Sequence, residues 1–214
     1  MGAGRPVSGE ELPAELEERI ASARNALEAH DDGHLPLGER RLVRAPFGNP
    51  GDGPEDRTPG RRRRFALHHD CVDRVMPVWR AARPEDDRPA RMVELAEQVI
   101  NGGIPADDVK AEEDQFALDL MDLAWDIGGR VNAAGEASVD LLSTATVGDY
   151  GDETPMEIDD HELDPDQLEA SFLGSIAVAS YPGASDDDVE ARRAYWRWYL
   201  DEAVPAAYRA VNGE

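Results

Sequence analysis

The sequence predicts an all-α protein that folds as a single globular domain of about seven or eight helices. Apolar residues recur every three or four positions along most of the 214-residue chain, which is the spacing of one helix face. The alternation of apolar and polar residues that is typical of β-strands is scarce. A hydrophobic content of 41% is enough for a packed core, and the length suits one domain over residues 1–214.

Four helices are expected in the first half of the chain. The first carries an apolar stripe at helical spacing, formed by Leu12, Leu16, Ile20, Ala23 and Leu27. A short helix over 37–45 follows, and then a flexible Pro/Gly-rich loop over 46–60. Four consecutive arginines, 61–64, are expected to begin the third helix and to pair with acidic residues. A fourth helix runs from Pro89 to the Asn-Gly-Gly stop signal at 101–103.

Four further helices are expected in the second half. The clearest stripe predicts one helix and consists of Phe116, Leu120, Leu123, Ala124, Ile127 and Val131. A shorter helix carries Val139, Leu142 and Thr146, and another contains the stripe from Leu168 to Ala179.

The final helix is expected over about 186–210, with Ser185 as its N-cap. Pro205 lies inside it and should kink it or end it one turn early. One face carries three residues expected to be buried, Trp196, Tyr199 and Ala203. Trp198 lies on another side, and two interpretations remain open. It packs beneath the acidic segment described below, or it is an exposed aromatic anchor for a partner.

Acidic residues outnumber basic ones and are concentrated in one part of the chain. There are 46 Asp and Glu against 22 Lys and Arg, which gives a formal net charge of −24. Between residues 107 and 190 there are 24 acidic residues and two basic ones, a net charge of −22, which leaves −2 for the rest. This asymmetry indicates either a solvated surface or an electrostatic patch that attracts a basic partner.

The densest acidic segment, over 148–166, is predicted to be a long loop because it holds two prolines and no helical periodicity. It lacks the spaced ligands of an EF-hand, so no calcium site is expected, and no other metal or cofactor. The partner is predicted to bind this segment, through Asp149, Asp152, Glu153, Glu157, Asp159, Asp160, Glu162 and Asp164, with Trp198 as a further contact.

Composition disfavours several classes of function. A net charge this negative disfavours binding to nucleic acid or to an anionic membrane surface. No apolar run approaches the ~20 residues that span a bilayer, and the chain does not begin with a signal-peptide pattern. The single cysteine, Cys71, excludes an internal disulfide. We therefore expect a soluble cytoplasmic protein.

One set of residues offers a catalytic alternative. His34, His69 and Asp70 are of the types that hold metal ions in all-α hydrolases of the HD type. The neighbouring His68 falls on an apolar stripe, which favours a hydrogen-bonded core histidine. No G-x-S-x-G, H-E-x-x-H or C-x-x-C motif occurs. The chain is therefore not expected to be an enzyme.

Three segments in order along the chain carry a family resemblance: LPLGERRLVRA (35–45), HDCVDRVMPVWRAARPEDDRPARMVELA (69–96) and RRAYWRWYLDEAVPAAY (192–208). They resemble the Imm5 family of predicted bacterial immunity proteins, found beside polymorphic toxin genes. The resemblance implies an all-α protein that binds and neutralises a toxin made by the same cell or delivered by its kin. It carries over no catalytic residue.

These observations together favour a stoichiometric, non-catalytic inhibitor of a cognate toxin that is itself basic. Acidic clusters speed the encounter with a positively charged cleft. Two alternatives remain: a generic helical protein-interaction module of a salt-adapted organism, whose acidity reflects its host, and the metal-dependent hydrolase.

Overall fold

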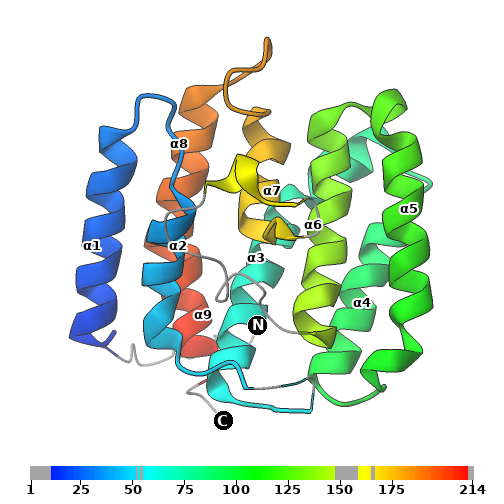
Figure 1. Ribbon diagram of the computed structural model, residues 1–214, viewed down its shortest axis with the longest axis horizontal. Coiled ribbons are helices and arrows are strands. Elements are labelled where there is room, and N and C mark those ends of the chain that lie inside the picture. The colour runs from blue at the N-terminus through cyan, green and yellow to red at the C-terminus, as the bar shows by residue number, and fades with distance from the viewer. Residues whose placement is uncertain (1–10, 52, 54, 148–158, 165–166, 212–214) are drawn as a thin grey trace, which may run out of the picture.

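The computed structural model describes residues 11–51, 53, 55–147, 159–164 and 167–211 (Figure 1). Within these ranges the chain is helical and holds no β-strand. Nine α-helical segments are present, and a π-helical turn joins the last two into one continuous helix, so the described chain has eight helices. The all-α single domain is confirmed. The segments are α1 (Ala14–Ala29), α2 (Leu37–Arg44), α3 (Pro59–Ala82), α4 (Arg88–Ile100), α5 (Lys110–Ile127), α6 (Gly129–Thr146), α7 (Ala170–Ala179), α8 (Val189–Trp198) and α9 (Val204–Ala210).

The centre of the bundle is formed by α3, α6 and α7, which contact one another. Around them, α4 and α5 pack on α6, while α8 packs on α7 and α9 packs on α3. Figure 1 shows α1 at one edge of the molecule and α5 at the opposite edge. Because α5 packs chiefly on α6, the other side of α5 faces outward. In the described ranges, no helix combines the length and the apolar character needed to cross a membrane.

The close packing of α6 depends on small buried residues, Ala133, Ala134, Gly135 and Ala137. A Cβ atom at Gly135 would lie 2.6 Å from Leu120 Cδ2 and 2.8 Å from Trp79 Cζ3. Both distances are far below van der Waals contact, so only glycine allows α3 and α5 to approach α6 this closely.

The boundary between α5 and α6 differs from the prediction. The stripe from Phe116 to Val131 predicted one helix, but α5 ends at Ile127 because Gly128 takes a φ of 78°. Glycine reaches positive φ without the steric cost that a Cβ imposes, and this conformation breaks the helical path. Val131 therefore belongs to α6, which is an 18-residue helix rather than the shorter one expected.

The loop expected over 46–60 is shorter at both ends. Ala45–Phe47 form a 3-10 turn in which Phe47 is buried, and α3 already begins at Pro59. The Thr58 side chain caps α3 by accepting a hydrogen bond from the backbone N–H of Arg61 (3.1 Å). Proline is tolerated in the first turn because its missing N–H would have no partner within the helix.

The arginines 61–64 lie in the first turns of α3, close to where the helix was predicted to begin. Arg61 is buried and donates to the carbonyl oxygens of Gly53 (3.0 Å) and Ala145 (2.7 Å). Arg64 donates to the Gly48 carbonyl oxygen (2.7 Å). Backbone carbonyl oxygens thus accept hydrogen bonds from arginines that were predicted to pair with acidic residues.

The final helix begins later than predicted. Asp188, rather than Ser185, is the N-cap, and its side chain accepts a hydrogen bond from the backbone N–H of Ala191 (3.0 Å). Pro205 does not end the helix, because the π-helical turn over Tyr199–Ala203 places it in the first turn of α9. The predicted buried face is confirmed, with little or no exposure of Trp196, Tyr199 and Ala203.

Candidate functional site: a buried charge network and an exposed helix face

A buried charge network joins α2 to the start of α7. Arg40 and Arg44 are four residues apart on α2 and share one face. Glu169, the N-cap residue of α7, accepts hydrogen bonds from Arg40 Nε (3.2 Å) and Arg44 Nη1 (2.8 Å). Asp160, in the 3-10 turn Asp160–Glu162, accepts a hydrogen bond from Arg40 Nη1 (2.9 Å) and ion-pairs with Nη2. All four side chains are almost completely buried.

Opposite charges, in place of water, stabilise each member of this network. Burial alone would lower the pKa of the Arg40 guanidinium, but Asp160 and Glu169 outweigh it, so that pKa is raised. Burial opposes the ionisation of Glu169, yet Arg44 and Arg40 hold its pKa well below the usual value. The pKa of Asp160 is also lowered, because Arg40 and His34 outweigh the effect of burial. Arg40, Glu169 and Asp160 are therefore charged near neutral pH.

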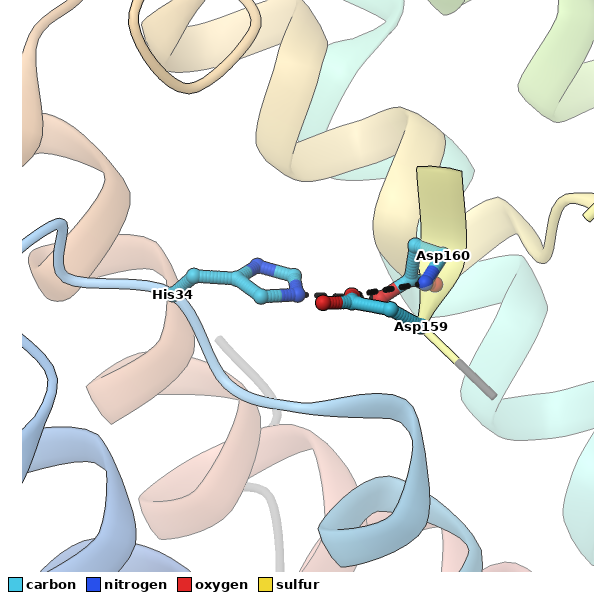
Figure 2. A group of neighbouring side chains, drawn as sticks. All are labelled: His34, Asp159 and Asp160. Carbon is cyan, nitrogen blue, oxygen red and sulfur yellow. Dashed lines mark hydrogen bonds and ion pairs between the residues drawn. The ribbon is translucent and has the colours of Figure 1, made fainter. Parts of the chain in front are cut away.

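His34 extends the network from the loop between α1 and α2. Its Nε2 lies 2.9 Å from Asp160 Oδ2, and its ring packs edge-on against Phe172 and Trp196. Figure 2 shows the ring directed at the acidic turn that carries Asp159 and Asp160. In the part of the chain that the structure describes, His34 and these two aspartates are the one group of His, Cys, Asp and Glu close enough to share a metal ion.

This donor set does not suit a metal ion. Both carboxylate oxygens of Asp160 already accept hydrogen bonds from the Arg40 guanidinium. A divalent cation beside that guanidinium would meet like-charge repulsion in a buried setting, where screening is weak. Arg40 supplies the positive charge that the turn needs, so we assign the cluster a structural role.

The residues of the alternative hydrolase site are not brought together. His34 belongs to the network described above, whereas His69 lies 3.2 Å from Glu97 Oε1 on the surface of α4. Asp70 is on α3 beside His69, and burial raises its pKa. His68 is buried and lies 3.0 Å from a threonine hydroxyl of α6, as its place on the apolar stripe predicted.

The acids predicted to bind the partner fall into three groups. Four lie outside the described residues: Asp149, Asp152, Glu153 and Glu157. Asp159, Glu162 and Asp164 are exposed, and the first two form a capping box in which Glu162 Oε2 accepts from the Asp159 backbone N–H (3.1 Å). Asp160 differs from the surface position expected of it, because its pairing with Arg40 keeps it buried.

Trp198 is half-buried and packs against the core. Its ring centroid lies 5.4 Å from that of Tyr195, and the guanidinium carbon of Arg74 on α3 lies 4.3 Å from it. It also lines a surface pocket that includes Asp70 and Glu202. Trp198 is thus already engaged within the fold, and only part of its ring is open to a partner.

The outward side of α5 carries large apolar side chains in contact with solvent. The exposed fraction is 96% for Trp125, 69% for Met121 and 57% for Leu118. Their spacing of three and four residues places them on one helix face. That face lies opposite the one on which Phe116 and Leu120 are buried against the core.

Two aspartates, Asp122 and Asp126, stand beside this apolar face. Both are exposed, and neither carboxylate takes part in a hydrogen bond or ion pair with another residue that the structure describes. This face was not predicted from the sequence, because the stripe that begins at Phe116 predicts only one apolar face of the helix. The signal that could have predicted it is a second apolar stripe at 118, 121 and 125, which has the spacing of one helix face.

Comparison with known families supplies the last observation. The sequence profile described as immunity protein Imm5 matches residues 20–206, which extend from α1 into α9. None of the curated proteins compared with the chain matches it.

Proposed function

Because the chain belongs to the Imm5 family of immunity proteins, we propose that it binds a cognate bacterial toxin and neutralises it stoichiometrically, without catalysis of its own. The observation that carries this proposal is the family match over residues 20–206 of 214. We place this action in the cytoplasm of the cell to be protected.

Charge supports a toxin that is basic. The chain has a net charge of −24, and most of the excess falls between residues 107 and 190. Such a surface raises the rate of encounter with a positively charged cleft and competes with an anionic substrate for it. The exposed acids among those predicted, including Glu162 and Asp164, belong to this surface.

The state of two buried histidines and of the single cysteine supports a non-catalytic mode of action. His34 and His68 are buried and bonded to neighbouring side chains. Burial raises the pKa of the Cys71 thiol to about 12, so that thiol is protonated near neutral pH and is a poor nucleophile.

The test is co-expression with the toxin domain encoded beside this gene. Cells that make both proteins should grow, cells that make the toxin alone should not, and the purified proteins should form a complex of fixed stoichiometry. His69→Ala with Asp70→Ala should leave protection intact if the fold is unchanged. Loss of protection in this variant while it still folds and binds the toxin would contradict a non-catalytic mechanism. A wild-type protein that neither binds nor protects would overturn the proposal.

A further inference from the structure

We infer that the outward face of α5, formed by Leu118, Met121 and Trp125 with Asp122 and Asp126 beside them, is the surface that contacts the toxin. The toxin would present to it an apolar pocket rimmed by arginine or lysine. We call this surface the α5 face. The inference rests on the proposed function, and it names the surface through which that function works.

Trp125 is unusually exposed for a tryptophan. Of the four tryptophans, Trp79 and Trp196 are fully buried, and Trp198 is half-buried beneath Arg74. Trp125 alone is almost entirely in water, although an indole ring gains free energy when it is buried. Contiguous apolar side chains on a surface mark interaction sites, and tryptophan is enriched among the residues that dominate binding energy.

The helix that carries this face is firmly packed and lies at the edge of the molecule. α5 has 18 residues and is held against α6 by a buried stripe that includes Phe116 and Leu120. It forms one edge of the molecule, so a partner can approach it without moving another helix (Figure 1). A partner that binds such a preorganised helix face loses little free energy to the ordering of the backbone.

The acids along α5 differ in whether they are paired with a basic residue. Asp119 ion-pairs with an arginine of α4 (2.7 Å), and Asp114 with the lysine one turn earlier (2.9 Å). Asp122 and Asp126, beside the apolar face, have no such partner among the described residues. The uncompensated charge therefore adjoins the exposed apolar side chains, which is the complement of an apolar pocket with a basic rim.

The same charges argue against a second copy of this chain as the occupant. In a twofold dimer through the α5 face, Asp122 and Asp126 would approach their own counterparts. Each chain also carries a net charge of −24, so the two faces would repel one another. A basic partner would instead be attracted both by the two aspartates and by the net negative charge of the chain.

The main experiment measures binding of the full-length protein to the purified toxin domain encoded beside its gene. Met121→Ala with Trp125→Ala should weaken binding by about 30-fold or more, mainly through faster dissociation, as expected for an interface hot spot. The melting temperature should hardly change, because both side chains are exposed. Val147→Ala removes a partly exposed apolar side chain from the end of α6 and serves as the control.

A second pair of variants tests the charges. Asp122→Lys with Asp126→Lys should slow association severalfold at low salt, and the effect should shrink above about 0.15 M salt. Glu15→Lys with Glu18→Lys makes the same change in net charge on α1, at the opposite edge of the molecule. A specific α5 face predicts a clearly larger effect for the α5 pair than for the α1 pair.

The outcomes separate this inference from the proposed function. If the wild type binds and protects, and the Met121/Trp125 variant does so equally well, the α5 face is overturned and the proposed function stands. If the wild type forms a dimer that the same variant disperses, the occupant is a second copy and the inference is also overturned. If the wild type does not bind the toxin, both fail together.

Discussion

The buried charge network and the α5 face both depart from the usual distribution of side chains. The network buries charged side chains, whereas the α5 face exposes apolar ones. In the network, Arg40, Arg44 and Glu169 are charged and buried, and each is bonded to its neighbours. On α5, Trp125 is apolar and exposed, and no other described side chain covers it. The charges of the first arrangement are paired within the chain, so it serves the fold. The second is incomplete without a partner, and a binding function is to be sought where such incompleteness remains.

The largest expected effect comes from breaking the network. Glu169→Ala removes a buried carboxylate that is paired with both Arg44 and Arg40, so the free energy of unfolding should fall by about 3–5 kcal/mol. Chemical denaturation measures this change. The matched control is Asp122→Ala, an exposed acid of α5, which should change stability by less than about 0.5 kcal/mol. Equal effects of the two variants would remove the contrast between the regions.

The two tryptophans sharpen the same comparison. Trp196→Ala should cost about 3–5 kcal/mol of unfolding free energy, because the ring is fully buried and its removal leaves a cavity. Trp125→Ala should change stability by no more than about 0.5 kcal/mol, while it weakens toxin binding. Thermal unfolding and toxin binding should be measured on both variants. If the roles are assigned correctly, the Trp196 variant has the larger loss of stability and the Trp125 variant has the larger loss of binding. A strongly destabilised Trp125 variant would show that its ring serves the fold.

Acid should weaken the network. The pKa values of Glu169 and Asp160 are lowered in the folded protein, so their contribution to stability is fully present above their ordinary values of 4.5 and 3.8. It is lost as the pH falls through those values toward the lower folded-state pKa. Wild type should therefore lose more unfolding free energy between about pH 5 and pH 3 than Glu169→Gln does. Parallel pH profiles for the two proteins would argue against ionised, paired carboxylates.

The smallest effect is expected from the acidic segment. Asp152→Lys, Glu153→Lys and Glu157→Lys together should slow association with the toxin by less than about tenfold at low salt and leave dissociation unchanged, because charges that do not contact the partner act mainly by steering. Stopped-flow association at two salt concentrations measures this. Trp198→Ala serves as the comparison, since a direct contact would instead raise the dissociation rate. A higher dissociation rate for the triple lysine variant would instead indicate that this segment contacts the toxin directly.

The sequence by itself was sufficient for the helices. Apolar spacing located the buried stripe of α1, and Pro89 and Asn101-Gly102-Gly103 marked the two ends of α4, because these signals act within a few residues of the backbone they shape. The sequence also correctly predicted that Trp196, Tyr199 and Ala203 are buried, because these residues share one apolar face of the helix. The boundary at Gly128 was missed because an apolar stripe can continue by chance across a helix break.

Tertiary structure alone decided which side chains of similar type are buried. Asp159 and Asp160 are neighbours in one acidic run, yet the first is exposed and the second is paired with Arg40, 120 residues earlier in the chain. Likewise α5 carries two apolar stripes, and the packing of α6 buries that of Phe116 and leaves Trp125 in water. Local periodicity indicates that a helix has an apolar face. Which face is buried is determined by the neighbouring helices, because burial depends on contacts between distant parts of the chain.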